Sequence, residues 1–258
     1  MSKLIGFIGK GGTGKSTLTA LFLKYVLQKN VKPILVIDAD PNACLGELIG
    51  LHVENTIGNI RQKLLNKKYE YSASISKYDY CEYALNNAIV ESKGFDLIVM
   101  GRSDGPGCYC YVNNIVKLMI EKLKKNYQLI IVDCEAGLEH LSRRTLGDIN
   151  ISFIIADLSR KGILTGVKQV ELMKELEIQT DKNYLLINDV IDEDKTKDFE
   201  KLIKESNNEE LKYLGIIHHD ENILKYELNQ NSLLDLPDDS KSYRDLRNIV
   251  DEINLFKT

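Results

Sequence analysis

The sequence predicts an α/β fold with a mostly parallel, doubly wound sheet and helices on both faces. Apolar runs of strand length recur along the whole chain, and segments with apolar residues three and four apart separate them. The runs are almost continuously apolar, which is typical of parallel strands buried on both faces. The expected strands are Leu4–Ile8, Pro33–Ile37, Phe95–Met100, Leu129–Val132, Ile151–Ala156, Tyr184–Ile187 and Tyr213–Ile217.

Two of the separating segments show the helical pattern most clearly. Apolar residues at helical spacing run from Leu18 to Tyr25, and again from Ile115, where the pattern leads into the basic stretch Lys122–Lys125. Lysines suit the C-terminal end of a helix, where the backbone dipole is negative. There is no repeat, no linker rich in Pro or Ser and no domain boundary, so residues 1–258 are expected to form one domain.

The composition is that of one soluble domain and argues against several classes of partner. The 258 residues are 43% hydrophobic and 28% charged, and the net charge of -4 gives no basic field for nucleic acid. Residues Met1–Lys10 already form an expected strand entering a Gly-rich loop, which leaves no room for a signal peptide, and no apolar run reaches membrane-spanning length. We therefore expect a cytoplasmic protein without a membrane partner, whose five cysteines are metal ligands or buried thiols rather than disulfides.

A Gly-rich loop with the pattern G-x-x-x-x-G-K-S lies between the first expected strand and the first expected helix. Glycines allow successive backbone N–H groups to surround a phosphate, and the helix N-terminus adds partial positive charge. Lys15 would reach the β- and γ-phosphates of ATP, and the Ser16 hydroxyl would ligate Mg²⁺. This context predicts an ATP/ADP site in a Rossmann-like P-loop NTPase fold. The loop residues are Gly9, Lys10, Gly11, Gly12, Thr13, Gly14, Lys15, Ser16 and Thr17.

Polar side chains that follow three other expected strands complete the predicted nucleotide site. Asp38 and Asp40 are two residues apart on an extended tail, so both carboxylates can face Mg²⁺ and an attacking water. Asp133 follows the strand Leu129–Val132 and fits a second Mg²⁺-side carboxylate, the Walker B position. Asn188 ends another strand and is a further candidate for nucleotide binding, although Asn is common at any strand end.

Lys10 is the more informative lysine, because so early in the loop it would point away from the nucleotide of its own subunit. The motif resembles that of the MinD, ParA and nitrogenase Fe-protein ATPases, the deviant Walker A class. In that class the second lysine crosses a dimer interface to the partner's phosphates. The class also has an Asn at the adenine edge, in the place that Asn188 matches. The resemblance implies a homodimer formed on ATP binding, with Lys10, Lys15 and Asp40 carrying hydrolysis. Taken alone, Lys10 could equally be a solvated surface lysine.

Cys108 and Cys110 form a C-x-C element between an expected strand and an expected helix. In an extended segment two such thiols point the same way and could bind one metal ion, and the helix N-terminus favours the thiolate form. Two thiolates half fill a tetrahedral site, and a twofold dimer would supply the other pair. The alternative is that both cysteines are buried or incidental.

The segments around Cys108 and around Asp133 resemble the CooC-type nickel-insertion ATPases. These proteins mature carbon monoxide dehydrogenase, and a close relative serves acetyl-CoA synthase. The matching stretches are Val99–Asn114 and Asp133–Thr145, and the similarity extends over nearly the whole chain. The resemblance implies an ATP-dependent homodimeric metallochaperone. One C-x-C per subunit would bind Ni²⁺ or Zn²⁺, and carbon monoxide dehydrogenase or acetyl-CoA synthase would be its client.

Two rival functions stay open. One is an electron-transfer ATPase with a dimer-bridging iron–sulfur cluster, as in the nitrogenase Fe protein. His140 stands where that protein has its cluster cysteine, and Cys134 is expected to face the core, which disfavours this rival. The other is a MinD- or ParA-like positioning ATPase without a metal role. The C-terminal stretch Asn248–Thr258 lacks the basic face with which an amphipathic helix binds anionic lipids.

The pair His218–His219 invites a metal hypothesis, but adjacent side chains on one chain point apart. It stands where members of the class often have an apolar residue and a proline before an Asp. We interpret both histidines as loop residues near the base.

Overall fold

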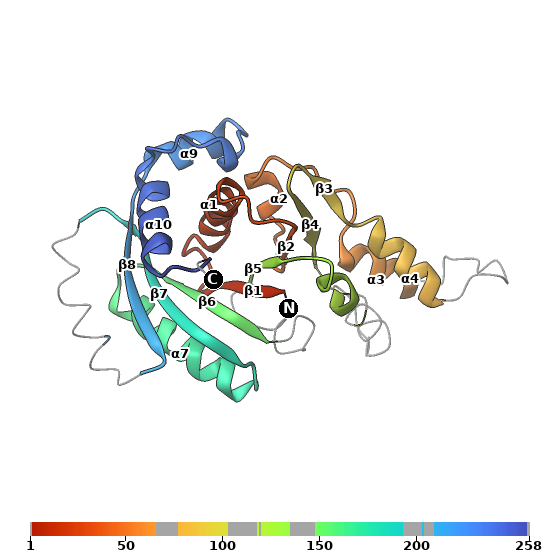
Figure 1. Cartoon of the computed structure of the whole chain (residues 1–258), viewed down its shortest axis with the longest axis horizontal. Coiled ribbons are helices and arrows are strands. Elements are labelled where there is room, and N and C mark those ends of the chain that lie inside the picture. Colours follow the sequence, from red (N-terminus) through yellow and green to blue (C-terminus); the bar gives the residue numbers. More distant parts are fainter. Residues whose placement is uncertain are drawn as a thin grey trace.

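A computed structural model describes residues 2–65, 77–102, 118, 120–134, 148–192, 203 and 209–256. The strands of this part form one eight-stranded sheet in the order β3-β4-β2-β5-β1-β6-β7-β8 (Figure 1). The strands are β1 (Lys3–Gly9), β2 (Ile34–Asp38), β3 (Val90–Ser92), β4 (Phe95–Val99), β5 (Leu129–Asp133), β6 (Ile149–Ala156), β7 (Thr180–Val190) and β8 (Leu211–His218).

All neighbouring strands are parallel except β3, which pairs antiparallel with β4. The seven apolar runs expected to be strands are strands, and the predicted α/β fold is confirmed. The pattern missed β3 because its three residues are partly exposed and form no apolar run. A tight turn connects β3 to β4, and its Gly94 has the left-handed φ of 98° that glycine adopts without strain.

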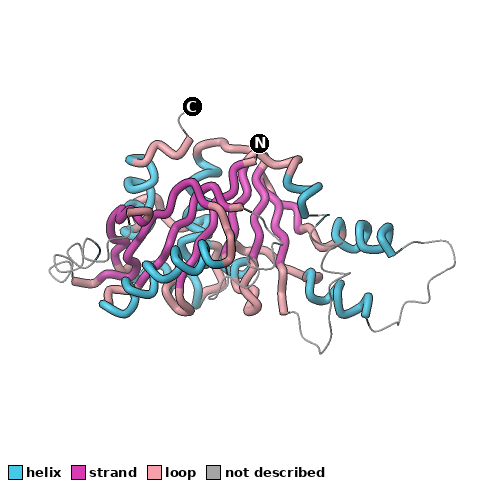
Figure 2. The backbone as a smooth tube through the Cα atoms, turned by 90° about the horizontal axis from the view of Figure 1, so that it is seen from below, coloured by secondary structure: helices cyan, strands magenta, loops and turns pink. Residues whose placement is uncertain are grey.

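Helices cover both faces of the sheet, as Figures 1 and 2 show, so the sheet is doubly wound. Helices α1, α2 and α10 pack on one face in a core with Phe7, Phe22 and Phe153, and α3, α4 and α7 contribute to the core of the other face. The helices are α1 (Lys15–Gln28), α2 (Leu45–Leu48), α3 (Ile57–Leu65), α4 (Lys77–Asn86), α7 (Arg160–Glu175), α9 (Glu221–Leu228) and α10 (Lys241–Glu252).

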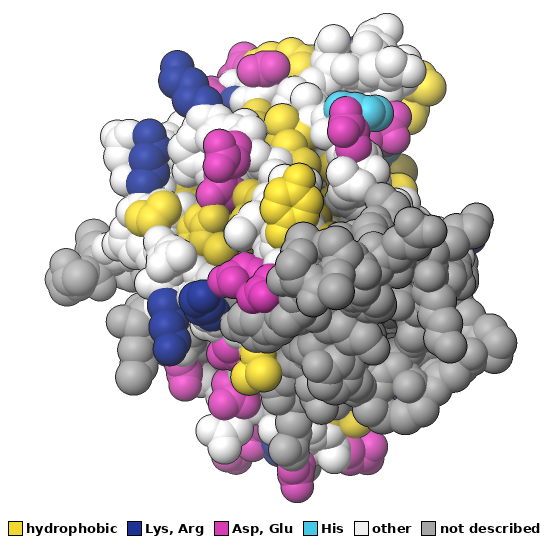
Figure 3. Space-filling view, turned by 90° about the vertical axis from the view of Figure 1, so that its right-hand side faces the viewer, with side chains coloured by type: hydrophobic (Ala, Val, Ile, Leu, Met, Phe, Trp, Pro, Cys, Tyr) yellow, Lys and Arg dark blue, Asp and Glu magenta, His cyan; other side chains and the backbone are white. Residues whose placement is uncertain are grey.

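The expected helix that begins at Ile115 can be followed only from residue 118, because the preceding residues lie outside the described part. Ile120 is fully buried in the core, whereas Leu118 is exposed. The described helices include none that is both long and apolar enough to cross a membrane. On the face in Figure 3, the described acidic, basic and hydrophobic side chains are mixed with one another.

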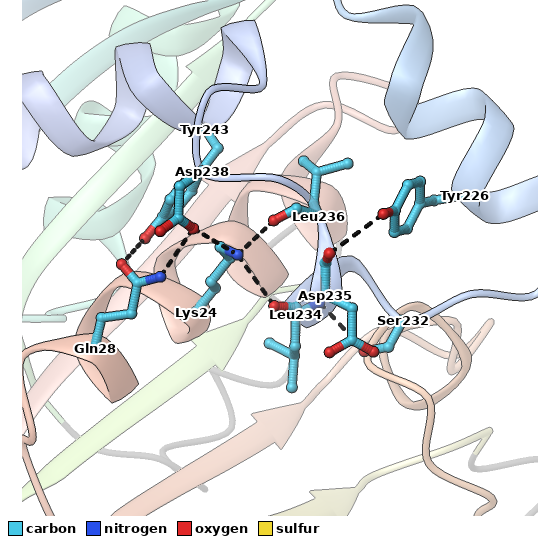
Figure 4. A network of polar contacts seen from close by, with 9 residues as sticks. All are labelled: Lys24, Gln28, Tyr226, Ser232, Leu234, Asp235, Leu236, Asp238 and Tyr243. Carbon is cyan, nitrogen blue, oxygen red and sulfur yellow. Dashed lines mark hydrogen bonds and ion pairs between the residues drawn. The ribbon is translucent and has the colours of Figure 1, made fainter.

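A buried lysine attaches the C-terminal segment to the helix that follows the phosphate loop (Figure 4). The Lys24 ammonium on α1 donates hydrogen bonds to the carbonyl oxygens of Leu234 and Leu236 and pairs with Asp238 at 2.9 Å. Its nitrogen also lies 4.9 Å from the centre of the Tyr243 ring on α10. A buried ammonium must be satisfied in this way, because an unpaired buried charge is costly. The contacts hold α10 beside α1, next to the loop that carries the site.

Candidate nucleotide site

The phosphate loop leaves the carboxyl end of β1 and enters α1 at Lys15. Gly12 and Gly14 have left-handed φ values of 79° and 86°, which the loop needs in order to reverse before the helix. Lys15 is buried, and its ammonium donates a hydrogen bond to the Lys10 carbonyl oxygen at 3.2 Å, so it lies folded over the loop. The Lys10 side chain is exposed, as expected for a lysine that points away from the loop's own nucleotide.

Two carboxylates lie side by side at the edge where the loop begins. Asp38 ends β2 and Asp133 ends β5, and the parallel register places them directly opposite each other. Both are fully buried. Burial raises the pKa of Asp38 to about 7, and the neighbouring Asp133 charge adds to the effect. Burial also raises the pKa of Asp133 to about 6, although the Ser16 hydroxyl and the Lys15 ammonium act in the opposite direction.

The chemistry of this pair fits a divalent cation. Within the described residues, neither carboxylate oxygen of Asp133 has a hydrogen-bond partner of normal geometry. A buried carboxylate without a partner is costly, and a cation bound to it would remove that cost. Carboxylate and hydroxyl oxygens, here from Asp38, Asp133 and Ser16, are the ligands that Mg²⁺ prefers. The predicted Mg²⁺ site is therefore consistent with the side chains present.

Asp38 and Asp40 occupy different environments, although both follow β2. Asp38 accepts hydrogen bonds from the backbone N–H groups of Asp40 and Leu45, each at 3.1 Å, and so also holds the loop that follows the strand. Asp40 is partly exposed and accepts one hydrogen bond from the Asn42 N–H at 2.8 Å. The sequence predicts a part in hydrolysis for Asp40 and a part in binding for Asp38, but the spacing does not predict that Asp38 is buried and Asp40 partly exposed. Asp40 can therefore accept further hydrogen bonds on the solvent side of the loop.

A pocket of about 270 Å³ opens on the other side of the phosphate loop. Gly12, Thr13, Gly14 and Thr17 form one wall. The ends of β6, β7 and β8 and the helix α9 contribute the rest, including Asp157, Leu158, Asn188, Asp189, His218, His219, Asp220, Ile223, Leu224 and Glu227. A pocket that adjoins the phosphate loop at the carboxyl ends of parallel strands is where a nucleotide base is expected in an open α/β sheet.

Asn188 joins the pocket to the phosphate loop. Its side-chain amide nitrogen donates a hydrogen bond to the Thr13 carbonyl oxygen at 2.9 Å. A Cβ atom at Gly14 would lie 2.3 Å from the same nitrogen, so Gly14 is required for close approach as well as for its φ. The sequence placed Asn188 at the base edge, and the structure places it between the base pocket and the loop.

The two histidines bind different carboxylates, which agrees with their side chains pointing apart. His218 Nδ1 lies 2.6 Å from Asp245 on α10, and His219 Nδ1 lies 2.6 Å from Asp189. Both histidines line the pocket, but only His219 is a loop residue, because His218 ends β8. Sequence reasoning missed Asp189. Its position next to Asn188 was visible, but its proximity to His219 depends on the pairing of β7 with β8.

The proposed metal ligands Cys108 and Cys110 lie outside the described residues, as does His140. Cys134 is buried, as expected, and burial raises the pKa of its thiol well above the usual range. Cys44 is exposed as a residue, but partial desolvation of its thiol and the charges of nearby carboxylates raise the pKa of that thiol. In the part of the chain that the structure describes, no three His, Cys, Asp or Glu side chains cluster closely enough to hold a metal ion.

Comparisons with known proteins agree with this geometry. An AAA domain family model matches residues 2–187. An uncharacterized ATP-binding protein of Methanocaldococcus jannaschii is 38% identical over 253 residues, covering 97% of this chain and 98% of that protein. The carbon monoxide dehydrogenase accessory protein CooC of Rhodospirillum rubrum is 26% identical over 187 residues, covering 68% of this chain and 71% of CooC.

Among solved structures, the septum site-determining protein MinD of Pyrococcus horikoshii, in complex with Mg-ADP, superposes with a TM-score of 0.68 at 18% identity. The superposition covers 98% of this chain and 96% of that one. It therefore extends beyond the phosphate loop to the complete eight-stranded architecture. This chain belongs to the AAA domain family and is a P-loop ATPase with the fold of MinD.

Proposed function

We propose that this ATPase is a metallochaperone that assists nickel insertion into carbon monoxide dehydrogenase or acetyl-CoA synthase. The observation that carries the proposal is the presence, in one chain, of a complete phosphate loop and the Cys108–Cys110 element. The 26% identity to CooC supports the same assignment. The nucleotide site would supply the energy, and the cysteines would hold the metal.

The described residues divide the work of ATP hydrolysis between them. The loop N–H groups and the buried Lys15 ammonium would bind the phosphates, and the base would enter the pocket beside Asn188. Ser16, Asp38 and Asp133 would hold Mg²⁺, which, when bound, neutralises charge on the β- and γ-phosphates. Asp40, partly exposed beside this group, would accept a hydrogen bond from the attacking water and orient it.

Lys10 would act across a dimer interface. Its carbonyl oxygen receives the Lys15 ammonium, while its own side chain is exposed. The exposed ammonium would neutralise γ-phosphate charge in a facing subunit, so ATP would close a homodimer and hydrolysis would reopen it. Closure would bring two C-x-C elements together, and a different metal affinity in the closed and open dimers would couple ATP to metal transfer.

A second function, that of a positioning ATPase without a metal role, is favoured by the whole-chain superposition on MinD. In that case Cys108 and Cys110 would bind no metal. The similarity to MinD, at 18% identity, supports the fold alone. The similarity to CooC, at 26% identity, covers 68% of this chain.

The test is metal stoichiometry in the wild type and in single Cys→Ser variants. We expect one Ni²⁺ or Zn²⁺ per dimer with four sulfur ligands by X-ray absorption, and loss of the metal in Cys108→Ser and Cys110→Ser. Cys44→Ser is the matched control, because that thiol is exposed and lies in another loop. Unchanged metal content in both variants would exclude the metallochaperone and favour the positioning ATPase. A broad visible absorption band in anaerobically purified protein would instead indicate an iron–sulfur cluster.

A further inference from the structure

The end of β7 carries an irregularity that directs two consecutive side chains into one pocket. The pairing of β7 with β8 shifts between Ile187 and Val190, and Asp189 has a left-handed φ of 60°. In a regular strand, neighbouring side chains point to opposite faces of the sheet. Here Asn188 and Asp189 both line the pocket beside the phosphate loop. A bulge of this kind redirects a side chain, and such bulges are common next to functional sites.

The redirected Asp189 side chain holds His219. Asp189 Oδ1 lies 2.6 Å from His219 Nδ1, and the His219 backbone N–H donates to the Val190 carbonyl oxygen at 3.0 Å. The imidazole is therefore fixed both by its backbone and by one ring nitrogen. His218 differs, because its Nδ1 faces Asp245 of α10 and its backbone N–H donates to the same carboxylate.

This arrangement determines the hydrogen-bonding character of the second ring nitrogen. A carboxylate only accepts hydrogen bonds, so the proton of the neutral imidazole lies on Nδ1, which faces Asp189. In this neutral form His219 Nε2 carries a lone pair and is an acceptor. The side chain is 45% exposed and lines the pocket together with apolar Leu158, Ile223 and Leu224, which could contact the faces of a planar base.

We propose that His219, positioned by Asp189, is a specificity-determining residue that selects a 6-amino purine over a 6-oxo purine. This inference rests on the proposed nucleotide site. The exocyclic amino group of adenine donates hydrogen bonds and suits the His219 Nε2 lone pair. The carbonyl oxygen at the same position of guanine or hypoxanthine is an acceptor, and two facing acceptors repel each other. Because the His219 side chain is half-exposed, water can partly satisfy Nε2 when a 6-oxo purine is bound, so we expect the discrimination to be about that of one hydrogen bond.

The test compares ADP with IDP, because the hypoxanthine of IDP differs from adenine in the 6-position and the adjacent N1 proton. We expect the wild type to bind ADP about tenfold more tightly than IDP, which corresponds to one hydrogen bond made or lost. His219→Ala should bind both with nearly equal affinity. His219→Lys, whose ammonium only donates, should prefer IDP. His52→Ala is the control, since His52 is exposed and does not line the pocket.

Asp189→Asn tests the positioning role separately from folding. The side-chain amide that this variant introduces can donate a hydrogen bond to His219 Nδ1. The imidazole proton then lies on Nε2, which becomes a hydrogen-bond donor instead of an acceptor. The ¹⁵N chemical shifts of His219 should report the change of tautomer, and the preference for ADP should fall in the same variant. A merely structural role of Asp189 would change neither.

The outcomes separate this inference from the function on which it rests. If the wild type binds neither ADP nor IDP, the nucleotide site itself is wrong. If the wild type binds both equally, or if folded His219→Ala keeps the full preference for ADP, the nucleotide site stands and His219 is not its specificity determinant.

Discussion

The phosphate half and the base half of the nucleotide site are built in different ways. The phosphate half consists of one continuous stretch, Gly9–Thr17, which runs from the end of β1 through the loop into α1, and of the ends of the adjacent strands β2 and β5. The base half is assembled from separate segments, which include Asn188 and Asp189 at a bulge in β7 and His219 after β8. Phosphates are bound mainly by backbone groups in a fixed loop geometry, whereas a base is recognised by individual side chains. The first half is therefore a sequence motif, and the second is a product of strand pairing.

The largest expected effect belongs to the phosphate half. Lys15→Ala should abolish nucleotide binding, because Lys15 is buried against the loop that holds the phosphates. Lys10→Ala should keep nucleotide binding but lose ATP-driven dimerisation and hydrolysis, because its exposed side chain acts on the partner subunit. Nucleotide titration and analytical ultracentrifugation with ATP separate the two. Normal dimerisation and hydrolysis in Lys10→Ala would remove the chain from the class with a second, trans-acting lysine.

Asp40→Asn should slow hydrolysis on the order of a hundredfold, because the charge that orients the attacking water is lost. The phosphate loop remains intact, so ATP should hold the variant as a persistent dimer in size-exclusion chromatography. A monomer with ATP would instead assign Asp40 to loop structure, through its hydrogen bond with the Asn42 N–H.

Asp38→Asn should stabilise the nucleotide-free protein while impairing Mg²⁺-dependent hydrolysis. Burial raises the pKa of Asp38 from 3.8 to about 7, so between these values the folded state binds more protons than the unfolded state. Stability from this group is therefore present at low pH and is lost as pH rises toward 7. The gain should be on the order of 1 to 4 kcal/mol at about pH 8 and roughly a third to a half of that at about pH 5. Urea unfolding at both pH values measures it, and an equal gain at both would contradict this cause.

The smallest effect concerns the contact between the two halves. Gly14→Ala should destabilise the protein by about 1 to 3 kcal/mol, because of its left-handed φ and the nearby Asn188 nitrogen. Asn188→Ala should cost about 1 kcal/mol through the lost hydrogen bond to Thr13. In the Gly14→Ala, Asn188→Ala double variant the new Cβ no longer meets the Asn188 side chain. The loss of unfolding free energy, measured by urea unfolding, should therefore be smaller than the sum of the two single losses. Simple additivity would mean that the halves are not coupled through this contact.

Much of the fold followed from the sequence because parallel strands buried on both faces need unbroken apolar runs. The antiparallel strand β3 was not visible, since a short edge strand with partly exposed residues leaves no such run. That Asp38 and Asp133 belong to one site was expected from their strand-end positions, but their direct opposition depends on the pairing of β2 with β5. The separate environments of Asp38 and Asp40 depend on the Leu45 N–H, seven residues away from Asp38, which spacing alone does not place. The metal role of Cys108 and Cys110 remains a prediction.

The sequence by itself determined the strand–loop–helix motif, its two lysines and the carboxylates that follow β2 and β5, because each is encoded within a short contiguous stretch. Only the tertiary structure decided which side chains meet at the base pocket. Asp189 and His219 are 30 residues apart, and their contact depends on the register between β7 and β8 and on the bulge within it. The apolar pattern constrains which face of each strand is buried, but it does not show where the pairing of β7 with β8 shifts, so this contact could not be read from the sequence.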